Sequence, residues 1–180
     1  MIYQNLLSRK NIEVKIEQKF PTLCWHNIWE NMSKNFITTK AKSILIEVFN
    51  DAFPNRIKMS NHNIAGIISH LCEVCGKPDT NSHRIKNCNK TKIVWNWVSE
   101  VIKDRLKLKL SSPDEILYTG INVKSFKAKS ALWLVSEAVA YTTVNYKNAN
   151  LFMFKEIIRD CRWNNRNLIY KHFNKFLNIC

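Results

Sequence analysis

Glycine and proline are both scarce in this chain. Its 180 residues include three glycines and four prolines. Because these residues dominate turns, their scarcity predicts few, long elements that are mostly helical. Hydrophobic residues make up 46% of the chain and charged residues 23%, a composition that supports a packed core and argues against disorder.

Acidic residues are also few. The chain has 14 Asp and Glu against 28 Lys and Arg, a net charge of +14 that favours RNA, DNA or another polyanionic partner. The acidic residues include no Tyr- or Phe-x-Asp-Asp pair of the kind that binds polymerase metal ions. No Glu-x-Lys follows Pro113-Asp114-Glu115 at nuclease spacing, so we interpret that stretch as a surface turn. We therefore expect no enzymatic activity.

Long hydrophobic runs are absent as well. The most apolar stretch, residues 128–144, contains Lys129 and Glu137 and is not a transmembrane candidate. Residues 1–10 lack the apolar run of a secretory signal. We therefore expect no membrane partner and an intracellular protein, in the nucleus or the cytoplasm, whose cysteines stay reduced.

One short segment combines three of the six cysteines with a histidine. Cys72, Cys75, His83 and Cys88 follow the spacing Cys-x2-Cys-x7-His-x4-Cys. Zinc favours thiolate and imidazole ligands, and four of them close a structural site without an open catalytic position. Gly76 suits a tight turn after the first pair. The segment therefore predicts a site for Zn²⁺.

Other interpretations of this segment stay open. The cysteines could form disulfides in an oxidising compartment, or they could be unrelated buried side chains. His70, close to Cys72, could also replace His83 as the ligand. Reduced intracellular thiols favour the metal over the disulfides.

Hydrophobic residues recur at helical spacing on both sides of the segment. We predict a single domain over 1–180, with N-terminal helices over 22–70, a zinc loop over 71–89 and C-terminal helices over 90–180. The fold class is mostly α, a helical bundle in two halves joined by a small Cys3His zinc loop.

The elements can be placed along the chain. An alternating stretch over 12–16 fits a strand or a frayed helix, and the one over 105–110 fits a strand or the continuation of a helix. The other predicted elements are a helix opening at Pro21-Thr22, a helix over 38–52, a connector over 56–69, a helix from a cap at Asn89 to about 102, a turn or extended piece over 115–120, a helix over 125–146 and a last helix from about 150 that is interrupted over 163–167.

Further motifs flank the cysteine segment. They are Trp25-x2-Ile28-Trp29, Ser33-Lys34, Ala52-Phe53-Pro54, Ile93-Val94-Trp95 and PDEILYTG over 113–120. Together with the ligand spacing, they resemble the zinc-binding region that follows the polymerase in non-LTR retrotransposon reverse transcriptases. The similarity extends over about residues 23–165, although residues 79–85 are more polar and basic than the family pattern.

The resemblance implies both a site and a role. It implies that Cys72, Cys75, His83 and Cys88 are the zinc ligands and that the chain corresponds to a detached tail of such a polymerase. In the intact family this region is expected to help hold template RNA or target DNA without doing chemistry.

Basic residues gather directly after the ligands. Between Arg84 and Leu110, eight basic residues stand against Glu100 and Asp104. Several phosphate contacts of this kind give affinity without sequence information. Trp95 and Trp163 are candidates for stacking on an unpaired base. The predicted nucleic-acid-binding residues are Arg84, Lys86, Lys90, Lys92, Trp95, Lys103, Arg105, Lys107 and Lys109.

The sequence thus favours a non-catalytic, zinc-stabilised module that binds RNA or DNA. The alternative is a structural, zinc-stapled helical module for protein–protein contacts with no nucleic-acid role. A third hypothesis is association of the last helix, through its Phe and Lys residues, with an anionic membrane. The choice between RNA and DNA and the oligomeric state stay open.

Overall fold

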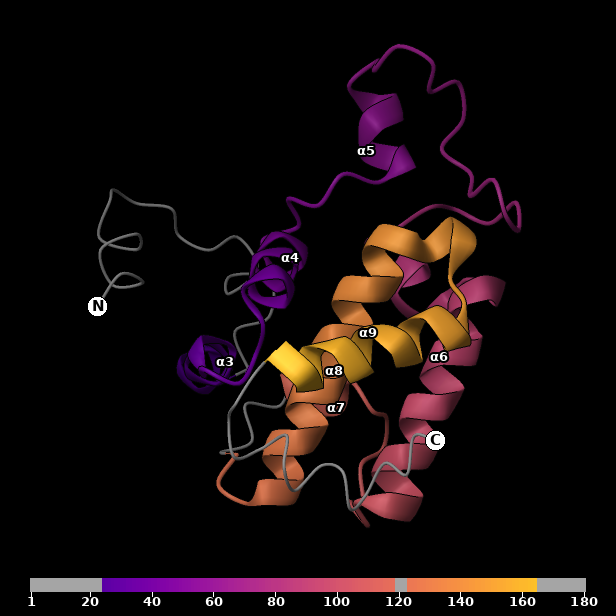
Figure 1. Ribbon diagram of the computed structural model, residues 1–180. Coiled ribbons are helices and arrows are strands. Elements are labelled where there is room, and N and C mark those ends of the chain that lie inside the picture. Colours follow the sequence, from indigo (N-terminus) through magenta and orange to yellow (C-terminus); the bar gives the residue numbers. More distant parts are fainter. Residues whose placement is uncertain (1–23, 119–122, 165–180) are drawn as a thin grey trace.

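The computed structural model describes residues 24–118 and 123–164 (Figure 1). These residues are mostly helical and contain no strand, apart from an isolated antiparallel bridge between Leu71 and Pro78. The predicted all-α fold class, with the cysteine and histidine cluster between helices, is confirmed. The elements are α3 (Trp25–Ser33), α4 (Thr39–Phe49), α5 (Arg56–Asn61), the π-helical turn η1 (His83–Asn87), α6 (Asn89–Glu100), the π-helical turn η2 (Val101–Arg105), α7 (Glu115–Tyr118), α8 (Phe126–Asn145), the 3₁₀ turn η3 (Tyr146–Asn148) and α9 (Leu151–Asn164).

Helix α8 is the centre of the core, and α4, α6, α7 and α9 all pack on it (Figure 1). The Ser125 hydroxyl accepts the N–H of Ala128 at 3.1 Å and caps its first turn. Residues 130–143 are buried on every side, which agrees with a stretch that is apolar over most of its circumference. The buried hydroxyls of Thr142 and Thr143 donate to carbonyl oxygens one turn earlier, at 2.8 and 2.6 Å. Among the described helices, none combines the length and the apolar character needed to cross a bilayer.

Helix α4 links the N-terminal half to this core. Thr38 caps it by accepting the N–H of Ala41 at 3.1 Å, and its apolar residues recur at helical spacing. Leu45 and Phe49 are buried, and Phe49 meets Trp25 of α3 edge to face with ring centroids 6.1 Å apart. The predicted apolar faces of both helices therefore lie in the core.

Two segments are helical where the sequence predicted none. The connector expected over 56–69 begins with α5, because the buried Asn55 side chain accepts the N–H of Lys58 at 3.0 Å and caps a helix of six residues. The turn or extended piece expected over 115–120 contains α7, which is four residues long. Both helices are too short to show a periodic apolar pattern, so their sequences do not predict them.

Other boundaries differ in detail. Helix α6 has Cys88, not Asn89, at its N-cap position, and the tail over 105–110 is neither helix nor strand after η2. Lys107 has φ of +56°, a left-handed conformation that ends the helix. The predictions for residues 12–16, Pro21-Thr22 and 165–180 lie outside the described residues.

A buried carboxyl group joins the two halves. Glu137 of α8 is buried, and its Oε1 accepts the N–H of Thr38 at 3.4 Å. Burial raises the pKa of this carboxyl above its ordinary value of 4.5, although the Thr38 hydrogen bond and Lys40 act in the opposite direction. The folded chain therefore holds a proton that the unfolded chain releases at lower pH.

We expect Glu137→Gln to stabilise the protein at neutral pH. As pH rises from about 4.5 through the raised pKa, the wild-type protein loses stability, because the unfolded chain releases the proton first. Glutamine keeps the acceptor for Thr38 but carries no ionisable group. Urea unfolding of both proteins between pH 5 and 8 should show a difference that grows with pH. A variant that is equally stable, or less stable, at neutral pH would contradict the assignment.

Candidate metal centre

Cys72 and Cys75 lie on one tight backbone turn. The Cys72 N–H donates to the carbonyl oxygen of Lys77 at 2.7 Å, and the Gly76 N–H donates to that of Cys72 at 2.8 Å. Gly76 has φ of +68°, a conformation that side chains with a Cβ rarely adopt. The turn therefore needs glycine here, as the sequence predicted, and it directs both thiols to the same side.

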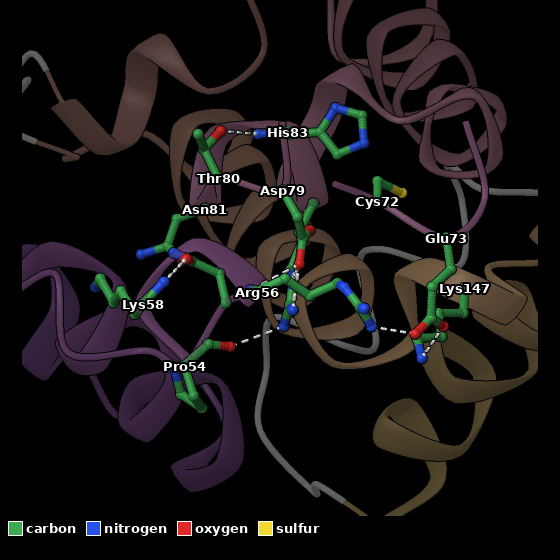
Figure 2. A network of polar contacts seen from close by, with 12 residues as sticks. Pro54, Arg56, Lys58, Cys72, Glu73, Asp79, Thr80, Asn81, His83 and Lys147 are labelled. Atoms are coloured by element: carbon green, nitrogen blue, oxygen red, sulfur yellow. Dashed lines mark hydrogen bonds and ion pairs between the residues drawn. The ribbon is translucent and has the colours of Figure 1, made fainter. Parts of the chain in front are cut away.

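His83 and Cys88 are the two ends of the second ligand segment. His83 begins the turn η1, and the Cys88 N–H donates to the His83 carbonyl oxygen at 2.8 Å, which closes the turn. The His83 N–H donates in turn to the Thr80 hydroxyl at 3.0 Å (Figure 2). These bonds fix the imidazole and the second thiol relative to each other.

The four side chains converge on one point. Sγ of Cys72 lies 4.0 Å from Sγ of Cys88, and Sγ of Cys75 lies 3.3 Å from Nε2 of His83. All four ligand atoms lie within 4.8 Å of one another. Tetrahedral zinc with Zn–S bonds of about 2.3 Å holds its sulfurs about 3.8 Å apart. The residues therefore fit a four-coordinate metal ion.

The alternatives left open by the sequence fit less well. Cys72, Cys75 and Cys88 are free thiols, and a gap of 4.0 Å between sulfur atoms is about twice a disulfide bond length. His70 is exposed and does not belong to the cluster; its carbonyl oxygen accepts the N–H of Asp79 at 3.0 Å. His83 is therefore the histidine placed to bind the metal.

Burial and local hydrogen bonds set the pKa values of these groups when no metal is bound. It raises the pKa of the Cys72 thiol to about 11, against the opposing N–H of Val74 3.4 Å from Sγ. Burial also acts to raise the pKa of Cys75, but the N–H of Lys77 and the neighbouring sulfurs outweigh it, and this pKa is lowered. Burial lowers the pKa of His83, which favours the neutral imidazole that binds metals.

A small apolar cluster surrounds the cysteines. Cys72, Cys88 and Tyr146 are its buried members, with Val74 packed against them, and it is separate from the main core. So few buried side chains stabilise a segment only weakly, since each contributes at most about 3 kcal/mol. The folded loop therefore depends on further interactions, of which a bound metal and a polar network are the two available.

The polar network lies directly beneath the metal loop (Figure 2). Asp79 is 0% exposed and accepts the backbone N–H of Arg56 at 2.9 Å, the first residue of α5. Nε and Nη2 of Arg84 donate to the same carboxylate at 2.9 and 2.5 Å. Nη1 of Arg84 donates to the Pro54 carbonyl oxygen at 2.8 Å, and the guanidinium lies 4.4 Å from the ring centroid of Tyr146. One buried ion pair thus joins the metal loop to α5 and η3.

A second ion-pair group borders the first. Glu73 lies between Cys72 and Cys75 in sequence, and its carboxylate pairs with Arg56 and Lys147 (Figure 2). These pairs tie the first ligand turn to α5 and to η3. The sequence did not single out Asp79, Arg56, Glu73 or Tyr146, because nothing in their local spacing shows which residues they meet.

The structure buries two of the predicted nucleic-acid-binding side chains. Arg84 is 6% exposed and its guanidinium is taken up by Asp79, Pro54 and Tyr146, so it offers no donor to a phosphate. Trp95 is also 6% exposed, and its Nε1 donates to the Ile85 carbonyl oxygen, so neither ring face is open to a base. Residues 113 and 114 form a turn, as the sequence predicted, but the Asp114 side chain is buried and paired with Lys86 and does not lie on the surface.

The remaining basic residues divide into two groups. Lys86 is partly exposed and ion-paired with Asp114, and Arg105 is half-buried. No side-chain description covers Trp163, which lies at the end of α9. The other lysines of the predicted set are exposed and have no ion pair within the described part of the chain. They are Lys90, Lys92, Lys103, Lys107 and Lys109.

Fold and site together define an all-α protein with a Cys3His cluster able to bind a metal ion. Comparisons of the chain with protein-family models, curated proteins and solved structures gave no match.

Proposed function

We propose that the protein is a non-catalytic, zinc-stabilised module that binds nucleic acid through its phosphate backbone. The observation that carries the proposal is the group of exposed lysines on α6 and its tail, which follows the last candidate metal ligand in the chain. The motifs shared with the zinc-binding region of retrotransposon reverse transcriptases support it, as does the net charge of +14.

Zinc is the metal that this donor set favours. Three thiolates and one imidazole are soft and borderline ligands, which select zinc over magnesium or calcium. Cys72, Cys75, His83 and Cys88 would hold it with all four positions filled, so it would stabilise the loop and activate no water.

The metal loop and the lysines are connected through α6. The Cys88 carbonyl oxygen accepts the N–H groups of Thr91 and Lys92 at 3.0 and 3.1 Å, so the first turn of α6 starts on a metal ligand. Lys92 lies on this turn, and Lys103 lies about 16 Å further along the helical axis on the same side of the helix. Together with Lys107 and Lys109 in the tail, they can contact several successive phosphates.

Ion pairs elsewhere in the described chain set the exposed lysines of α6 and its tail apart from the other charged residues. Six of the twelve acidic residues of the described chain are ion-paired with a nearby base, whereas the exposed lysines of α6 and its tail have no ion pair among the described residues. The ion pairs are Glu30 with Lys34, Asp51 with Lys58, Glu73 with Arg56 and Lys147, Asp79 with Arg84, Asp114 with Lys86, and Glu156 with Arg159.

Replacing three lysines at the far end of this surface tests the proposal. We expect Lys103→Gln with Lys107→Gln and Lys109→Gln to weaken binding to single-stranded RNA. The slope of log K against log salt should fall by about 2, because three phosphate contacts each contribute about 0.7. Fluorescence anisotropy over a salt series measures both the affinity and the slope.

The matched control removes the same charge from the other half. Lys34→Gln with Lys40→Gln and Lys58→Gln should leave affinity and slope nearly unchanged, since these residues lie on or beside α3, α4 and α5. Equal losses in both triple variants would mean that net charge alone drives binding. If the wild-type, zinc-loaded protein binds neither RNA nor duplex DNA at low salt, the proposal is wrong and a protein partner becomes the better hypothesis.

A further inference from the structure

A hollow of about 450 Å³ lies between the end of α4, the turn η1 and the loop before α7. Val48, Phe49 and Ile85 give it apolar walls, and Lys86, Ser112 and Asp114 supply polar groups. A pocket with apolar walls and a few convergent polar groups is the usual form of a site for a small, flat ligand. Its volume is ample for one nucleobase with its sugar.

Asp114, which lines this hollow, has one carboxylate oxygen without a hydrogen-bond partner among the described residues. Its side chain is buried, with the residue 3% exposed, and one carboxylate oxygen, Oδ2, accepts from Lys86. The other oxygen, Oδ1, is buried and has no hydrogen-bond partner among the described residues. A buried acceptor without a donor is costly, so a ligand that donates to Oδ1 would recover that free energy.

A second hollow lies next to the first and is bordered by three of the exposed lysines. It measures about 550 Å³, is lined by Lys103, Lys107 and Lys109, and shares Ser112 with the first hollow. A strand whose phosphates contact these lysines can therefore place a neighbouring base beside Asp114. The neighbouring positions of the two hollows relate the unpartnered Asp114 oxygen to the same kind of ligand that the lysines favour.

We propose that the hollow at Asp114 and Lys86 binds an unpaired guanine of a single-stranded nucleic acid; this inference rests on the proposed function and specifies its ligand. Guanine carries two adjacent donors, N1–H and the N2 amine, beside the O6 acceptor on one edge. A carboxylate accepts two such donors, and the ammonium of Lys86, with three N–H groups, can hold Asp114 and still donate to O6. Adenine, cytosine and uracil lack this donor–donor–acceptor edge.

The edge that guanine would present is the one used in base pairing, so a duplex cannot supply it. Recognition of unpaired bases through this edge is the common mode for single strands. Val48, Phe49 and Ile85 line the hollow and would give the ring an apolar surrounding.

The test uses labelled oligouridine strands that differ at one central base. We expect the zinc-loaded protein to bind the strand with guanine about tenfold or more tightly than strands with adenine, cytosine or uracil. A strand with inosine, which lacks the N2 amine, should lose part of this preference. The matching single-stranded DNA should show the same order of bases, and a duplex should show none.

Protein variants complete the experiment. Asp114→Asn should abolish the preference for guanine, whereas Asp104→Asn, at an exposed acid that lines neither hollow, should keep it. Because inosine changes only the ligand, the test remains decisive even if Asp114→Asn folds poorly. Equal affinity for all four bases, with normal salt dependence, would overturn the guanine site and leave the proposed function intact. Absence of binding to every strand would overturn both.

Discussion

Removal of the metal is expected to unfold residues 70–83 and to loosen the turn that ends at Cys88, while Ile85, α4 and α8 remain packed in the main core. The cluster around the ligands has only Cys72, Cys88 and Tyr146 as buried members, whereas α4 and α8 belong to the large main core. Zinc binding to small Cys/His sites contributes on the order of 10 kcal/mol, far more than so few side chains can replace. Cys72→Ser with Cys75→Ser, or treatment with a chelator, should therefore release the loop.

Hydrogen exchange with and without zinc measures this effect directly. The amides of Cys72, Gly76 and Cys88, which donate to carbonyl oxygens within the loop, should lose protection, and those in the middle of α8 should keep it. Cys24→Ser is the matched control, because Cys24 is an exposed free cysteine outside the cluster. Unchanged protection of the loop amides after complete metal removal would show that the loop folds without a metal.

Loss of the Arg84 side chain is expected to destabilise the protein by about 3–5 kcal/mol. The Asp79 carboxylate is 0% exposed, and without Arg84 its remaining described partner is the N–H of Arg56. A buried charge left without its counter-ion costs much more than the pair itself contributes. Arg84→Ala should therefore lower the urea midpoint far more than a surface substitution does.

The control is an ion pair of the same kind on the surface. Lys34→Ala breaks the 2.5 Å contact with Glu30, which is exposed, and should cost about 1 kcal/mol or less. A double-mutant cycle gives a further check: Asp79→Ala with Arg84→Ala should be less destabilised than the sum of the two single variants, because no lone charge remains buried. Additive losses, or a small effect of Arg84→Ala, would show that the network contributes little.

Much of the helical fold could be predicted from local patterns. The apolar circumference of residues 130–143 and the faces of α3 and α4 repeat over several turns, so periodicity marks them clearly. The candidate metal ligands were predictable for a different reason. Cys72 and Cys75 are close in sequence, as are His83 and Cys88, and Gly76 marks the turn that follows the first pair. Short elements such as α5 and α7 were missed because they lack even two full repeats.

The lysine-rich segment shows the limit of sequence reasoning. Charge alone placed Arg84 with Lys90 and Lys92 as phosphate contacts, although Arg84 is buried against Asp79 while the two lysines are exposed. The same limit applies to Asp114, which looked like part of a surface turn. Whether a charged side chain faces solvent or a counter-ion depends on residues distant in the chain.

The sequence by itself determined the helical class, the ligand set and the excess of positive charge, since each follows from composition or from spacing over a few residues. Only the tertiary structure decided which charges remain exposed and which are paired. Asp114 meets Lys86, and Arg84 meets Pro54, across about thirty residues of chain. Such contacts arise when helices pack, because packing brings together side chains whose separation in sequence carries no pattern.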